Sequence, residues 1–313
     1  SAGRGGGPIQ ATLKSQPPNS INGKIRITDQ GEVIQQKYGY EPLAKYNLCS
    51  YIGAVVQATL NPPPEPKIKW KQLIEKMSKI SMKSYRGNIN EKSDFIRYFR
   101  TVTPHKALGK LSIGSRPSKR KNVDNIQSLR AIPWVFAWTQ IRLFLPAWLG
   151  TTEALNYASS KLFKKTLVDM EKNWPFFNST MDILDMVISK VDPEISKVYE
   201  NQLADKKLKI VGKKLRLQFE SLKRLNRVIT PSQIRKQRKK FRTSVIIRNI
   251  YSEVLHITQS IVMKKVSSKK INKNGKRYLD DALMTSIAGI SAAMKNTGSV
   301  SYTHLTLPTT PYV

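Results

Sequence analysis

Residues 114–150 constrain the fold more than any other stretch, because a basic loop changes there into an aromatic, largely uncharged run. The loop's cations are Arg116, Lys119, Arg120, Lys121 and Arg130, and the run that follows carries Trp134, Trp138 and Trp148. Guanidinium groups at the edge of a dry aromatic wall are typical of a site for an anion with several oxygens. A solvated basic loop that leads into a buried helix is the alternative, and this stretch alone favours it slightly.

The chain carries 54 Lys and Arg against 21 Asp and Glu, a formal net charge of +33. Its hydrophobic content of 40% indicates a globular protein. Such a charge is typical of proteins that bind nucleic acid, a membrane surface or an anionic ligand, and residues 235–242 alone resemble a nucleic-acid patch. The excess is spread over Lys-rich stretches that also hold many Ile and Asn residues, as codon usage in a genome rich in A and T produces. We therefore prefer codon bias, with a basic nucleic-acid-binding module as the alternative.

The length of 313 residues fits about two domains or one large barrel. Cys49 is the single cysteine, which excludes an intramolecular disulfide and a Cys-based zinc cage, and its apolar surroundings predict a buried structural thiol. No stretch is apolar for long enough to cross a membrane, and no signal peptide is recognisable. We therefore expect a cytoplasmic protein that contacts no membrane.

Both ends of the sequence differ from the rest. It starts at Ser1 without Met and directly inside a glycine-rich motif, which predicts a fragment of a longer protein. Residues 299–313 contain no charged side chain, although Lys and Arg occur throughout the remainder. We expect this tail to be foreign vector or adapter sequence, and residues 1–298 to be the functional part.

The motif GRGGGP at residues 3–8 is a glycine loop built around Arg4. Glycines let the backbone approach a ligand and the arginine can bind an anion, although a plain flexible loop explains the motif equally well. It is not a P-loop, because no Gly-Lys-Ser/Thr follows. Further on, Lys24–Thr28 alternates in a way that predicts a strand, and the apolar pattern resumes at Val33 and Ile34.

Most of the remaining chain has the periodicity of amphipathic helices, so the content is mainly helix with few strands. Helices are expected over residues 40–60, 67–100 (as two), 155–168, 178–190, 195–240, 244–262 and 279–294. Asn178 or Ser179 is expected to cap the fourth of these segments, and Lys190 to close it. Apolar stripes at helical spacing are more often core than binding site, and one is formed by Ile250, Val254, Ile257 and Ile261. His105 is expected in a loop with a structural role.

Several segments together resemble phosphoenolpyruvate carboxylase of the bacterial type. They are GRGGGP at 3–8, QGEVI at 30–34, GSRPSKR at 114–120, SLRAIPWVFAWTQ at 128–140 and MKNTG at 294–298. The resemblance covers residues 1–298 without a large gap and corresponds to the C-terminal part of the enzyme. It implies a mainly helical chain within an α/β fold: the C-terminal part of a (β/α)8 barrel of the TIM type, with many additional helices.

The resemblance also implies a reaction and its residues. The family carboxylates phosphoenolpyruvate with bicarbonate to give oxaloacetate and phosphate, using Mg or Mn, and works as a homotetramer. Arg4, Arg116 and Arg130 match catalytic arginines, and Lys119, Arg120 and Lys121 lie in a mobile loop. The feedback site for aspartate or malate corresponds to Arg4, Lys190, Arg248 and Asn296. An arginine shared by both sites would let a bound dicarboxylate withdraw it from catalysis.

Parts of the family's machinery are absent from this sequence. The catalytic His, the essential Lys and the acidic metal ligands would lie upstream, so the resemblance implies no metal ligand in this chain and no carboxylase activity of the chain alone. Between Arg120 and Ser128 the family's Pro and paired Gly are replaced by KNVDNIQ, which puts the loop's closing motion in doubt. A degraded, inactive remnant of the enzyme is a further alternative.

Overall fold

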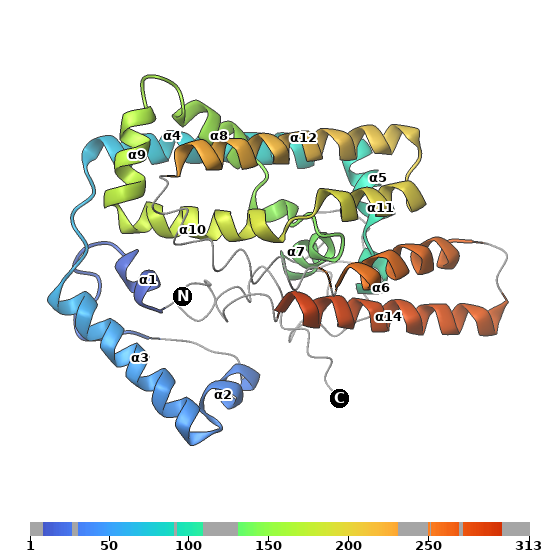
Figure 1. Cartoon of the computed structure of the whole chain (residues 1–313), viewed down its shortest axis with the longest axis horizontal. Helices are drawn as coiled ribbons and strands as arrows, with labels where there is room; N and C mark the ends of the chain where they lie inside the picture. The colour runs from blue at the N-terminus through green and yellow to red at the C-terminus, as the bar shows by residue number, and fades with distance from the viewer. Residues whose placement is uncertain are drawn as a thin grey trace.

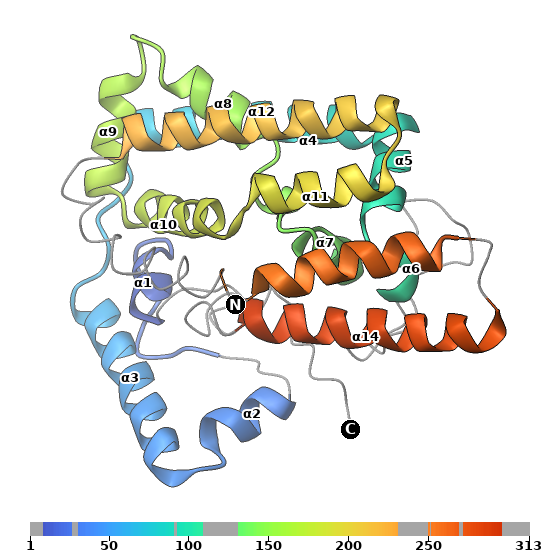
Figure 2. The same ribbon diagram turned by 45° about the vertical axis from the view of Figure 1, so that its right-hand side comes forward.

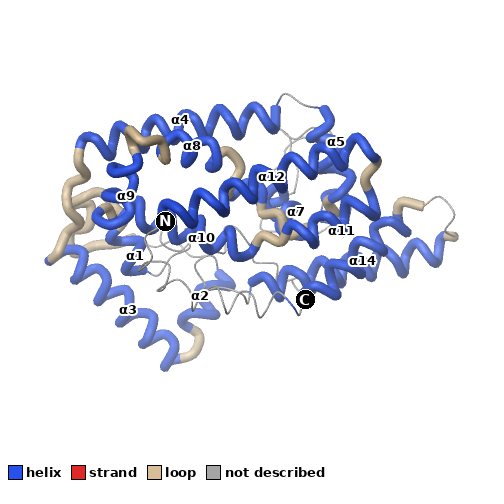
Figure 3. The backbone as a smooth tube through the Cα atoms, turned by 45° about the horizontal axis from the view of Figure 1, so that its top comes forward, coloured by secondary structure: helices blue, strands red, loops and turns tan. Residues whose placement is uncertain are grey.

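A computed structural model describes residues 9–26, 31–90, 93–108, 131–230, 250, 252–268 and 272–295. Within these ranges the regular structure is helical and contains no strand (Figure 3). The first helices are α1 (Ile9–Lys14), α2 (Gly31–Tyr38), α3 (Glu41–Leu60), α4 (Ile68–Asn90), α5 (Ser93–Val102), α6 (His105–Leu108) and α7 (Ala131–Gln140). They are followed by the 3-10 turn η2 (Leu145–Ala147), α8 (Thr151–Ala158), α9 (Lys164–Asn173), α10 (Pro175–Lys190), α11 (Pro193–Leu203), α12 (Lys206–Ile229), a helix over residues 252–266, and α14 (Lys273–Lys295).

The expectation of a mainly helical chain is confirmed, whereas the predicted strand at Lys24–Thr28 is not found where it can be checked. Residues 24–26 have neither helical nor strand structure, and residues 27–28 lie outside the described part. The apolar pattern at Val33 and Ile34 belongs to helix α2. Two apolar residues in sequence fit either element, and here the helix prevailed.

Helices α4, α8 and α12 pack side by side along one edge of the molecule, with α10 and α11 lying beneath them (Figures 1 and 2). Helix α5 contacts both α12 and α11 of this group. Its aromatic residue Phe99 packs on Trp138 of α7, so α5 connects the group to α7. The helix over residues 252–266 lies beside α14 and forms with it a separate pair of long helices. Helix α7 therefore lies between this pair and the larger group.

The aromatic run of the central stretch is buried, as expected from its lack of charge. Trp138 and Trp148 are fully buried, and Trp134 is nearly so. Trp134 and Trp138 of α7 pack edge to face with ring centroids 5.5 Å apart, and Phe99 of α5 lies 4.8 Å from Trp134. Such aromatic pairs add roughly 0.5–1.5 kcal/mol beyond the burial of their area. The contact fixes α7 against α5.

Several predicted helix boundaries were wrong. The segment 155–168 is two helices, because α8 ends at Ala158 and α9 begins at Lys164. Helix α10 begins at Pro175 after Trp174, so neither Asn178 nor Ser179 caps it, although Lys190 closes it as predicted. Pro at the first helical position suits a helix start, because its missing N–H would have no intrahelical partner there.

The basic segment 195–240 is also divided. Helix α11 begins after Asp192, whose side chain accepts hydrogen bonds from the backbone N–H groups of Glu194 and Ile195. Asp205 caps α12 in the same way by accepting from Leu208 N–H. Both aspartates satisfy N–H groups that have no partner inside the helix. Residues 231–240 lie outside the described part, and His105 begins the short helix α6 rather than lying in a loop.

The helix over residues 252–266 turns the opposite face to the core from the one that its apolar stripe suggests. Ile250, Val254, Ile257 and Ile261 are 40–68% exposed. The buried face instead carries Ser252, His256, Gln259 and Ser260, together with Val262 and Met263. Hydrophobic periodicity located the helix but not its buried face, because partners on other helices satisfy these polar groups.

Helices α2 and α3 extend away from the larger group of helices (Figures 1 and 2). Only Ala54 and Ala58 of α3 are buried, whereas Leu43, Ile52 and Leu60 are among its exposed apolar residues. Cys49 is exposed on this helix, so the prediction of a buried thiol was wrong. Helix α3 thus presents a long apolar surface to solvent.

A buried ion pair joins α11 to α12. The carboxylate of Glu200 is 2% exposed and accepts hydrogen bonds from Arg216 and from the hydroxyl of Tyr98, the latter at 2.7 Å. Burial, followed by the charge of Glu200, raises the pKa of Tyr98 well above its usual range, so the hydroxyl remains a donor. Gly212 of α12 lies against this carboxylate, and a Cβ at that position would collide with it.

Two glycine substitutions test this packing. Gly212→Ala should destabilise the chain by about 1–3 kcal/mol, because the added methyl displaces Glu200 from its partners. Gly53→Ala is the matched control, since an added Cβ meets nothing within 4 Å on the exposed side of α3. It should stabilise by up to about 1 kcal/mol through helix propensity. Urea denaturation followed by circular dichroism measures both, and equal stabilities of the two variants would contradict this account.

Candidate functional site

The structure describes one of the residues that the sequence nominated for a site. Lys190 ends helix α10, as expected. The remaining nominated residues lie outside the described part: Arg4, Arg116, Lys119, Arg120, Lys121, Arg130, Arg248 and Asn296. The site is therefore built outward from Lys190.

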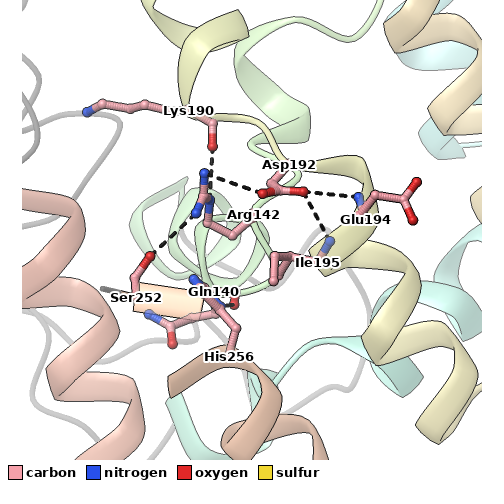
Figure 4. Close-up of polar contacts among 8 residues, drawn as sticks. All are labelled: Gln140, Arg142, Lys190, Asp192, Glu194, Ile195, Ser252 and His256. Atoms are coloured by element: carbon pink, nitrogen blue, oxygen red, sulfur yellow. Dashed lines mark hydrogen bonds and ion pairs between the residues drawn. The ribbon is translucent and has the colours of Figure 1, made fainter. Parts of the chain in front are cut away.

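Lys190 is a buried cation, with 2% of its surface exposed. Burial, and second the charge of Arg142, lower the pKa of its ammonium to about 8. The ammonium points away from the Arg142 guanidinium, while the backbone carbonyl of Lys190 points toward it (Figure 4). A lysine whose pKa lies this near neutrality can exchange a proton when an anion binds.

Arg142, which follows α7, is the second buried cation and is 1% exposed. Its Nε donates to the carbonyl oxygen of Lys190 at 3.0 Å, and its Nη1 donates to Ser252 Oγ at 3.4 Å (Figure 4). Its Nη2 lies 3.9 Å from Asp192 Oδ2, an ion pair that is too long for a hydrogen bond. Burial lowers the pKa of the guanidinium to about 10, against the opposing charges of Asp192 and Glu253, so it stays charged at neutral pH.

The backbone at Arg142 contributes to the same arrangement. Its φ of 56° lies in the left-handed region, which is uncommon for a residue other than glycine. The carbonyl oxygen of Arg142 accepts a hydrogen bond from Asp192 N–H at 2.9 Å. The residue therefore contacts the chain on both sides of Val191, through its backbone at Asp192 and through its side chain at Lys190.

A row of buried polar side chains continues from α7 into the pair of helices formed by residues 252–266 and α14. Tyr199 of α11 donates to Gln259 Oε1 at 2.7 Å, and Gln259 Nε2 donates to Gln140 Oε1 and to Ser286 Oγ, both at 3.1 Å. Gln140 Nε2 in turn donates to Ser291 Oγ at 3.1 Å. These bonds set the orientation of both amides and fix four helices against one another.

His256 belongs to this row and is fully buried. Its Nδ1 lies 3.0 Å from the carbonyl oxygen of Gln140, which can only accept, so Nδ1 carries the proton (Figure 4). Burial, followed by the charge of Arg142, lowers the pKa of His256 to about 3, although the bond to Gln140 opposes this shift. The imidazole is therefore neutral near pH 7.

Sequence reasoning missed both Arg142 and His256. The signal for Arg142 was present, because it is the single charged residue between Ala131 and Gly150. A lone charge inside an aromatic, buried run predicts a partnered arginine in the interior. The sequence offered no comparable signal for His256, whose partners lie 57 to 116 residues away.

The described residues contain no group of three or more His, Cys, Asp or Glu side chains arranged to hold a metal ion. None of their helices combines the length and the apolar character that crossing a membrane requires.

Comparison with known proteins identifies the family. A family model of phosphoenolpyruvate carboxylase matches residues 1–298. The chain belongs to the phosphoenolpyruvate carboxylase family. Phosphoenolpyruvate carboxylases from Acinetobacter baumannii and Hahella chejuensis are 45% and 43% identical to it over 307 and 297 residues. One from Escherichia coli O1:K1 is 43% identical over 302 residues.

These relatives are much longer than this chain. Each alignment covers 95% of the chain but 34% of the relative, so the chain spans about a third of their length. None of the three is named as a nucleic-acid-binding protein. The family match thus gives no support to the alternative of a basic nucleic-acid-binding module.

The buried neutral His256 predicts acid sensitivity. Between its unfolded pKa of about 6.5 and its folded pKa of about 3, the unfolded chain binds a proton that the native chain does not. Stability should therefore fall as the pH is lowered through this window, by up to about 1.4 kcal/mol per pH unit from this group. His256→Asn keeps a donor for Gln140 but cannot titrate, so its acid unfolding midpoint should lie at lower pH, as measured by tryptophan fluorescence. An unchanged midpoint would contradict the assignment.

Proposed function

We propose that this chain is the C-terminal part of an enzyme that carboxylates phosphoenolpyruvate with bicarbonate to give oxaloacetate and phosphate. The observation that carries the proposal is the family match over residues 1–298, together with 43–45% identity to three enzymes named for this activity. The finer fold belongs to the same proposal. The described helices would be the outer and additional helices of the C-terminal part of a (β/α)8 barrel of the TIM type.

In this proposal Arg4, Arg116 and Arg130 stabilise negative charge. Phosphoryl transfer to bicarbonate leaves an enolate, and the phosphate, carboxylate and enolate oxygens all carry charge as the transition state forms. Preoriented guanidinium groups stabilise such charge best where water is excluded. The buried tryptophans of α7 support this role, because the residue after Arg130 begins that helix and leads directly into a dry wall.

The divalent cation of the proposed enzyme, Mg or Mn, would be held by residues outside this chain. The described residues contain no cluster of His, Cys, Asp or Glu side chains that would fit it. Assembly as a homotetramer and a cytoplasmic location also belong to the proposal for the whole protein. Residues 299–313, which lie beyond the family match, are proposed to be foreign.

Exposed apolar surface supports the idea that the chain functions with further protein. Leu43, Ile52 and Leu60 of α3 are exposed, as are Val254 and Ile257 of the helix over residues 252–266. Large apolar side chains left exposed in such number often mark contacts with other protein. In the proposed enzyme, the region that corresponds to the unmatched part of the relatives would cover these apolar side chains.

The carboxylase proposal is tested by joining residues 1–298 to the part of the Escherichia coli relative that this chain does not match. The joined protein should form oxaloacetate from phosphoenolpyruvate and bicarbonate, as measured by coupling to malate dehydrogenase, and the 313-residue chain alone should not. Arg130→Ala in the joined protein is the negative control. Turnover by the isolated chain would refute the proposal that it needs the rest of the enzyme for activity. A joined protein that is soluble but inactive would favour a degraded remnant of the enzyme.

A dicarboxylate site is proposed at Arg4, Lys190, Arg248 and Asn296, for an inhibitor such as aspartate or malate. The buried cations Lys190 and Arg142 support it, because their nearby carboxylates, Asp192 and Glu253, reach the surface. Arg142 and Lys190 lie close enough together for the charge of Arg142 to lower the pKa of Lys190. Two such cations would attract a dicarboxylate.

Lys190→Ala tests this site. In the active joined protein, the substitution should abolish inhibition by aspartate, since the ammonium that binds a ligand carboxylate is lost, while carboxylation without aspartate continues. Lys197→Ala is the matched control, because Lys197 is an exposed lysine on α11 that pairs with Glu194. Inhibition constants from initial rates decide the matter. Inhibition that is unchanged in Lys190→Ala would exclude the residue from the site.

A further inference from the structure

Arg142 joins two segments that lead to the proposed dicarboxylate residues. On one side its Nε donates to the carbonyl of Lys190, the last residue of α10. On the other side its Nη1 donates to Ser252 Oγ in the helix over residues 252–266. Ser252 follows Arg248 by four residues in the sequence. One guanidinium therefore contacts the backbone of one proposed ligand-binding residue and a helical residue four positions after another in the sequence (Figure 4).

We propose that Arg142 is the positioning residue of the dicarboxylate site, which it serves by holding the end of α10 and the helix over residues 252–266 together. This inference rests on the dicarboxylate site proposed above and assigns a role to a residue outside its four members. Arg142 is not proposed to touch the ligand. It acts through Lys190 and through the helix that carries Ser252.

The contacts of Arg142 fall where a helix end needs them. The last carbonyl groups of a helix have no partner inside it, and the Lys190 carbonyl is one of these. Arg142 satisfies it through Nε and, one peptide further on, accepts the N–H of Asp192 with its own carbonyl. The chain that leaves Lys190 is thus held at two points, which restricts the direction of the Lys190 side chain. A planar guanidinium can bridge two segments in this way, whereas an ammonium forms no fixed fork.

Arg142 also acts on Lys190 through its charge. Burial and this charge together lower the pKa of Lys190 to about 8. Among the described residues, the charges of Asp192 and Glu253 act on Arg142, and His256 is neutral at this pH. A dicarboxylate requires the protonated ammonium, so its affinity should fall as the pH rises above about 8. Removing the charge of Arg142 raises the pKa of Lys190 and moves this fall to higher pH.

The test uses the joined, active protein and aspartate as the probe. Aspartate inhibition is measured from pH 7 to 10 for two variants. Arg142→Gln removes both the charge and the planar guanidinium group, whereas Arg142→Lys removes the guanidinium group but retains the charge. Both variants should bind aspartate at least about tenfold more weakly at pH 7, because a charged hydrogen bond is lost. Only Arg142→Gln should shift the pH at which inhibition is lost upward. The inhibition constant should change more than the KM for phosphoenolpyruvate in both.

Two controls separate positioning from loss of folding. Arg216→Gln breaks the ion pair with Glu200 and should lower the melting temperature without moving the pH profile of inhibition. Ser252→Ala removes one contact of Arg142, keeps the charge, and should weaken aspartate binding by about threefold. This variant decides the matter if both Arg142 variants fail to fold, since an unchanged inhibition constant would then overturn the inference.

The outcomes distinguish the inference from the proposal beneath it. An unmodified protein that aspartate does not inhibit at any pH would refute the dicarboxylate site itself. A protein that aspartate inhibits, and whose Arg142 variants keep the same inhibition constant and pH profile, would overturn the role of Arg142 alone. If both variants bind aspartate more weakly but have the same pH profile, the effect of the Arg142 charge on Lys190 would be overturned. The role of Arg142 in holding the two helices together would remain.

Discussion

A guanidinium that is 1% exposed inside a helical protein must find acceptors there, because removing an unpaired charge from water costs several kcal/mol. Arg142 finds them on Lys190 and Ser252, with Asp192 nearby. These partners come from the end of α10, the helix over residues 252–266, and the cap of α11. Meeting the requirements of one charge therefore sets the relative positions of three helices around the end of α7.

The polar row beside Arg142 extends the same constraint. Tyr199, Gln259 and Gln140 are bonded in series, and serines of α14 complete the row. In a low-dielectric interior, leaving any member unpaired is costly, so the helices keep the register that satisfies all of them. The apolar core provides most of the stabilisation, whereas this row selects the arrangement. In the proposed dicarboxylate site, the buried cations beside this row would favour an anionic ligand.

Sequence reasoning was most successful where one physical effect dominated. The buried aromatic run, the helices α4 and α5 and the closing position of Lys190 all followed from hydrophobicity and periodicity. It was wrong where tertiary partners decided the outcome. Ile257 and Ile261 suggested the buried face of their helix, but His256 and Gln259 occupy it. Cys49 has apolar neighbours in sequence, yet α3 extends away from the main group of helices and leaves it exposed.

The sequence by itself determined that this chain is mainly helical, that the aromatic run with Trp134, Trp138 and Trp148 is buried, and that its motifs resemble those of phosphoenolpyruvate carboxylase. These properties depend on local periodicity, hydrophobicity and residue order, which a sequence contains directly. Only the tertiary structure decided that Arg142 binds the backbone of Lys190 and that His256 is neutral and buried. Such properties depend on desolvation and on partners from 48 to 116 residues away, and local patterns carry no information about either.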